Sequence, residues 1–153
     1  MLFRSKLEGL ITIADIATSY MDVHDSTTLS TARTVCKNIV ETLDGALIIG
    51  DEEHVFDRGK VLVAAANPDL MESYIRMGDI VILGNRYESQ LCAIEMQAGC
   101  IVVCEGAPVS MTIKKLAVEN HCTIISTPQK SVAYTSSFVT RLMTNSFVSF
   151  IIS

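Results

Sequence analysis

The chain has 153 residues, of which 49% are hydrophobic and 19% charged, and its net charge is −5. This apolar content is enough to bury a core and excludes a disordered chain, and the length suggests one domain or one domain plus a fragment. The acidic balance argues against a nucleic-acid partner, which favours basic surfaces.

The first predicted elements lie in residues 1–22, where an apolar run ends at Thr12 and a helix-like run starts at Asp15. Either side chain could simply cap the helix. Alternatively, Asp15 could accept hydrogen bonds from ribose hydroxyls while Thr12 meets phosphate. Spacing alone leaves both interpretations open. Charged residues interrupt the start and no apolar run reaches membrane length, so we expect a cytoplasmic protein with no membrane partner.

A polar, Ser/Thr-rich stretch without periodicity predicts a linker over residues 23–33, followed by one domain over 34–145. Helical spacing of Val35, Ile39 and Leu43 predicts a helix over 31–45. The following elements are predicted as a strand at 46–50, an acidic solvated turn at 51–59, a strand at 60–66, and a helix at 67–78 with Asn67 as its cap.

From residue 79 onward, short Ile/Val-rich runs alternate with amphipathic stretches. Strands are predicted at 79–84, 100–104 and 122–126, and helices at 86–99, 108–120 and 131–143. Pro108 would open the second of these helices, because a first helical position needs no amide partner. This βαβαβα order predicts an α/β fold, a three-layer domain with a mainly parallel sheet and right-handed crossovers.

The turns that follow the three strands are the predicted site, because ligands of open parallel sheets bind beyond the carboxyl ends of strands. Asn85 and Arg86 follow the first strand, and Glu105 and Gly106 follow the second. Arg86 could hold an anion, or Asn85 could cap a helix while Arg86 makes a salt bridge or a subunit contact. Gly106 permits a tight turn or close ligand approach.

No complete active site is predicted, because the chain contains no phosphate-binding loop, dinucleotide fingerprint, nucleophile elbow or zinc-protease motif. The five cysteines form no CxxC pair and the three histidines share no ligand spacing, so we expect buried free thiols and neither catalytic nor metal-binding residues.

The segment GLITIADIATSYM resembles the end of a CBS domain, and Gly9, Leu10, Ile11, Thr12 and Asp15 match its motif. The resemblance implies that residues 1–22 are the C-terminal remnant of such a domain. Asp15 would then meet adenosine ribose and Thr12 the phosphate side. Such a partial site would be completed by CBS residues that this chain lacks.

Residues 34–145 resemble a DRTGG domain, carried by the stretch from GDIVILGNRYESQ to NHCTIISTP. Asn85–Arg86 stand where Asp–Arg is common in that family, and Glu105–Gly106–Ala107 stand where Thr–Gly–Gly is common. A CBS tail followed by a DRTGG domain is similar to the regulatory region of CBS-containing, manganese-dependent (family II) inorganic pyrophosphatases. Residues 146–153 would connect to a second CBS domain.

This resemblance implies a non-catalytic regulatory fragment in a homodimer. Its CBS domains would bind AMP, ADP, ATP or diadenosine polyphosphates and tune pyrophosphate hydrolysis by catalytic domains that hold manganese or magnesium. Two alternatives stay open. One is a DRTGG sensor domain of an acetyltransferase-type or stand-alone regulatory protein, and the other is a small-molecule enzyme with Arg86 as anion holder and Glu105 as base.

Overall fold

The computed structural model describes residues 34–64 and 67–130. The predicted CBS remnant at 1–22, the linker at 23–33, the helix at 131–143 and the connector at 146–153 therefore lie outside the described residues. In the part described, no helix is long and apolar enough to cross a membrane.

The domain is built on a five-stranded sheet with the strand order β2-β7-β6-β5-β4. Four neighbouring strands run parallel, and β2 pairs antiparallel with β7 at one edge. All five strands were predicted, but the direction of β2 was not. The strands are β2 (Ala46–Ile49), β4 (Val61–Val63), β5 (Ile80–Leu83), β6 (Cys100–Val103) and β7 (Thr123–Ser126).

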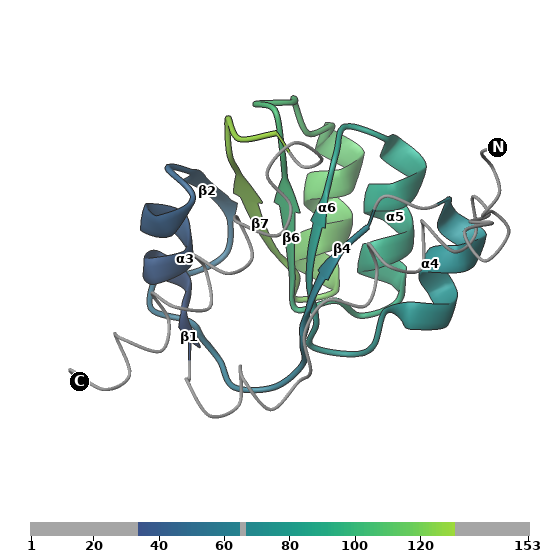
Figure 1. Ribbon diagram of the computed structural model, residues 1–153, viewed down its shortest axis with the longest axis horizontal. Helices are drawn as coiled ribbons and strands as arrows, with labels where there is room; N and C mark the ends of the chain where they lie inside the picture. The colour runs from purple at the N-terminus through teal and green to yellow at the C-terminus, as the bar shows by residue number, and fades with distance from the viewer. Residues whose placement is uncertain (1–33, 65–66, 131–153) are drawn as a thin grey trace, which may run out of the picture.

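Helices cover both faces of the sheet, which confirms the predicted three-layer α/β fold (Figure 1). One face carries α4 (Pro68–Tyr74), α5 (Tyr87–Glu95) and α6 (Met111–Glu119), and the other carries α3 (Cys36–Thr42). Alternate strand residues feed two separate cores. Leu62, for example, belongs to the core under α4–α6, whereas Val61 and Val63 belong to the core beside α3.

A second, two-stranded sheet pairs β1 (Thr34–Val35) antiparallel with β3 (Val55–Phe56). The prediction of a helix over 31–45 and a solvated turn over 51–59 was therefore wrong in detail. The helix starts only at Cys36, because loop carbonyls cap it: the backbone N–H of Cys36 donates to the His54 carbonyl (2.8 Å) and that of Lys37 to the Glu52 carbonyl (2.9 Å). The acidic turn thus has a structural role.

Helix ends also depart from the prediction, whereas the Asn67 cap is confirmed, with its side chain accepting from the Leu70 N–H at 3.1 Å. Helix α6 starts at Met111 and not at Pro108, because the Ser110 hydroxyl accepts from the Ile113 N–H at 3.2 Å. Helix α4 stops at Tyr74, well before Gly78, because Ile75 is extended (φ −74°, ψ 133°).

Candidate functional site

The three predicted turns do lie together at the carboxyl edge of the parallel sheet, because β5, β6 and β7 run in the same direction in neighbouring positions. The register pairs Leu83 with Val103 and Val103 with Ser126, so the three strands end at the same level. The structure therefore brings Asn85 and Arg86 to the same edge as Glu105 and Gly106.

The turn after β6 is held by backbone hydrogen bonds. Glu105 and Gly106 both have positive φ (63° and 61°), and the Ala107 N–H closes the turn on the Cys104 carbonyl at 3.3 Å. The N–H of Glu105 donates to the Gln129 carbonyl (2.8 Å) and that of Gly106 to the Thr127 carbonyl (2.9 Å). These amides are used within the protein, so they do not form an anion-binding nest.

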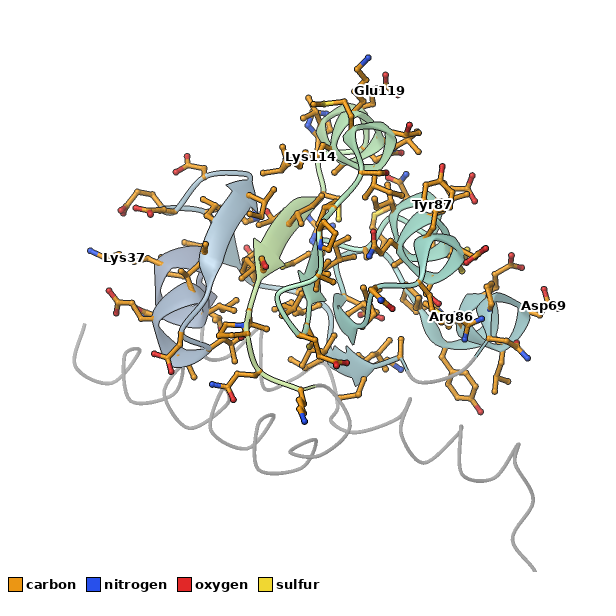
Figure 2. All side chains as sticks on the ribbon, turned by 90° about the horizontal axis from the view of Figure 1, so that it is seen from above. Lys37, Asp69, Arg86, Tyr87, Lys114 and Glu119 are labelled. Atoms are coloured by element: carbon orange, nitrogen blue, oxygen red, sulfur yellow. The ribbon has the colours of Figure 1, made fainter. Side chains whose placement is uncertain are left out.

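The turn after β5 is fixed from inside by Gln90, a buried side chain whose amide donates to the Gly84 carbonyl at 3.2 Å. Asn85 and Arg86 are both exposed. The interpretation of Asn85 as the helix cap is wrong, since Arg86 occupies the cap position of α5 and makes no side-chain cap bond. Figure 2 shows Arg86 and Tyr87 at the start of α5, and Lys114 and Glu119 projecting outward from α6.

A pocket of about 440 Å³ lies at the opposite, amino edge of the sheet, between the end of β2 and the C-terminal end of α6. Its polar lining side chains are Asp51, His54, His121 and Thr123. Sequence reasoning missed this pocket, because its residues come from segments about 70 positions apart with no recognisable spacing. Arg86 and Glu105 do not line it.

Asp79 is a second feature that the sequence analysis missed, and it holds the amino edge together. The side chain is 1% exposed, and its oxygens accept from the backbone N–H groups of Lys60 (2.9 Å) and Arg76 (2.8 Å). Burial raises the pKa of Asp79, although these bonds and the two neighbouring cations oppose the rise. The signal available in the sequence for this structural role was an aspartate directly before a buried strand.

The five cysteines are free and buried, as predicted. Burial is the main cause that raises the pKa of the Cys36 thiol to about 11 and those of Cys104 and Cys122 to about 12. These thiols are poor nucleophiles and poor metal ligands at neutral pH. Over residues 34–64 and 67–130, no group of three or more His, Cys, Asp or Glu side chains is placed to hold a metal ion.

The family model of the DRTGG domain matches residues 38–141, and the chain belongs to that family.

Among known proteins, the chain is 38% identical over 126 residues to a cobalt-dependent inorganic pyrophosphatase of Clostridium perfringens. That alignment covers 82% of this chain but only 23% of the relative. The structure is also similar to a crystal structure of the CBS and DRTGG domains of the regulatory region of Clostridium perfringens pyrophosphatase, complexed with its activator diadenosine tetraphosphate. The TM-score is 0.69 at 36% identity, over 89% of this chain and 57% of that chain.

These comparisons confirm the resemblance to a pyrophosphatase regulatory region. The predicted nucleotide residues Gly9, Ile11, Thr12 and Asp15 lie outside the described residues. Their role stays a prediction, as does any ligand role of Asn85, Arg86, Glu105 and Gly106.

Proposed function

We propose that this chain is a non-catalytic regulatory part of an inorganic pyrophosphatase, coupling adenine-nucleotide binding at CBS domains to pyrophosphate hydrolysis elsewhere in the parent protein. The observation that carries the proposal is the similarity, over 89% of the chain, to a regulatory region solved with a dinucleotide activator. Coupling of this kind needs only a difference in nucleotide affinity between two conformational states of the parent.

In this proposal, Thr12 and Asp15 form one wall of an adenosine site, and residues of complete CBS domains form the others. AMP, ADP, ATP and diadenosine polyphosphates are the candidate ligands. The parent is a cytoplasmic homodimer, and its catalytic domains bind a divalent metal, for which we propose manganese or magnesium although the relative is named cobalt-dependent.

Calorimetric titration of AMP and diadenosine tetraphosphate tests the half-site. We expect little or no heat with the 153-residue chain and saturable binding with a longer protein that carries both complete CBS domains. In the longer protein, Asp15→Asn should weaken AMP binding at least tenfold, because hydrogen bonds to a charged group are lost.

Asp25→Asn, in the predicted linker, is the matched control and should bind AMP as the unaltered protein does. Tight binding by the 153-residue chain alone would refute the half-site. An unchanged affinity in Asp15→Asn would show that Asp15 is not part of the site. Pyrophosphatase activity that stays the same when nucleotide binds would refute the coupling.

A further inference from the structure

The pocket at the amino edge of the sheet owes its shape to an irregularity in the edge strand β2. The pairing register between β2 and β7 shifts between Leu47 and Ile49. In a regular strand these two residues would face the same side. Here Leu47 packs against the core beside α3, whereas Ile49 packs against the core under α4–α6 and lines the pocket. The bulge therefore reorients the apolar side chain of Ile49 so that it lines the pocket.

The apolar part of the lining continues on α6. Ala117 is buried, and Val118 is 59% exposed on the last turn of this helix. Together with Ile49 they give the pocket an apolar side. Its volume of about 440 Å³ falls within the range of about 300–1,000 Å³ that is common for small-molecule sites.

The polar part of the lining is acidic and rich in acceptors. Asp51 contributes a carboxylate, of which one oxygen already accepts from the Glu53 N–H at 2.9 Å, leaving the other oxygen for a ligand. His54 and His121 add imidazole nitrogens that can accept when neutral. Among the residues that the structure describes, no Lys or Arg lines the pocket. The C-terminal end of α6, where the helix dipole is negative, makes the electrostatic potential at the pocket more negative.

We propose that this pocket binds a small organic cation, an ammonium or guanidinium group on an apolar body of a few carbon atoms. The charged group pairs with Asp51 and donates to the imidazoles, and the body lies against Ile49 and Val118. An anion would meet the carboxylate and the negative end of α6, and while both imidazoles are neutral no described lining residue offers it a positive charge. This site does not depend on the proposed nucleotide coupling, so either can fail without the other.

Nuclear magnetic resonance of the 153-residue chain tests the proposal, with n-butylguanidinium as the probe and butanoate and n-butanol as charge controls. We expect saturable shifts of the backbone amide signals of Gly50, Asp51 and Thr123 with the cation alone. Equal affinity for all three compounds, or cation-induced shifts spread over every acidic surface residue, would overturn the proposal. So would the absence of shifts at the pocket.

Two variants assign the effect to the pocket. Asp51→Asn keeps the oxygen that accepts from Glu53 but removes the charge, and should weaken cation binding about tenfold. Glu53→Gln makes the same charge change in the same loop outside the pocket and should leave binding unchanged. Equal loss in both variants would show general electrostatics and contradict the site.

His121→Asn is a second, independent variant. His121 is exposed with φ 54°, a conformation that asparagine tolerates, so the fold should survive the change. Loss of the imidazole should weaken cation binding several-fold, and unchanged binding would contradict a role for this wall of the pocket.

Discussion

Asp79 shows how one residue can join three segments of the domain. Its side chain bonds the amides before β4 and after α4, and its backbone carbonyl accepts from the N–H of Gly99 at 2.8 Å, just before β6. Since a buried charge is costly unless it is fully hydrogen-bonded, this arrangement stabilises the fold only when both side-chain oxygens act as acceptors.

Replacing Asp79 by Asn should lower the free energy of unfolding by about 2 kcal/mol, because an amide NH₂ would then face a backbone N–H that loses its acceptor. Denaturant unfolding measures the change. Asp57→Asn removes the same charge at an exposed position and should change the stability by less than about 0.5 kcal/mol. Similar losses in both variants would contradict the role of Asp79.

Gly59 is required at the same edge for steric reasons. It has φ 87°, and a Cβ atom there would clash with the carbonyl oxygen of Gly78, which is backbone and cannot move aside cheaply. Gly59→Ala should therefore destabilise the domain by about 3 kcal/mol or more. The melting temperature, followed by circular dichroism, reports the loss.

Gly84→Ala is the matched control for Gly59→Ala, because an added Cβ at Gly84 meets no atom of the described residues within 4 Å and its φ is not positive. Its unfolded chain loses freedom, so stability should stay the same or rise by about 0.5 kcal/mol. A destabilised Gly84→Ala protein would mean that the glycine effects arise from something other than the contact with Gly78.

At the scale of elements, the sequence predicted which segments form the sheet, because continuous Ile/Val runs are typical of strands buried on both faces. It did not predict β1 and β3, two-residue strands that form by pairing with each other, Thr34 with Phe56 and Val35 with Val55. Apolar periodicity carries no information on such pairing, nor on the antiparallel direction of β2. The caps were predictable where a side chain makes the bond, as at Asn67.

The start of α6 can be tested directly. Ser110→Ala removes the hydroxyl that accepts from the Ile113 N–H and should cost about 1 kcal/mol of stability, measured by denaturant unfolding. Asn85→Ala, by contrast, should change the stability little, because the cap position of α5 belongs to Arg86 and is made without a side-chain bond. A loss of stability in Asn85→Ala larger than that in Ser110→Ala would show that Asn85 caps α5, as predicted.

At the scale of the whole molecule, the predicted turns gather at one edge as expected, because parallel strands end together. The pocket lies at the other edge, and nothing in the sequence marks it. A bulge, a helix end and a loop meet there only after the strands have paired. The sequence predicted the domain family better than it predicted the pocket, because the DRTGG resemblance spans most of the chain and does not depend on any single site residue.

The buried thiols make the stability of the whole domain fall at alkaline pH. A thiol with the ordinary pKa of 9.0 when unfolded and about 12 when folded keeps its proton longer in the folded state. Its contribution to stability is complete below pH 9 and is lost as the pH rises towards 12, by about 1.4 kcal/mol per pH unit for each thiol. The free energy of unfolding should therefore fall steeply above pH 9.

Cys104→Ala separates this effect from other alkaline titrations. The cavity left by the sulfur lowers stability equally at every pH, so the diagnostic quantity is the slope, which should become less steep by about 1.4 kcal/mol per pH unit between pH 10 and 11. A slope equal to that of the unaltered chain would show that Cys104 ionises as readily in the folded state as in the unfolded state.

At pH 8, a thiol reagent should modify none of the five cysteines until denaturant is added, because all five are buried.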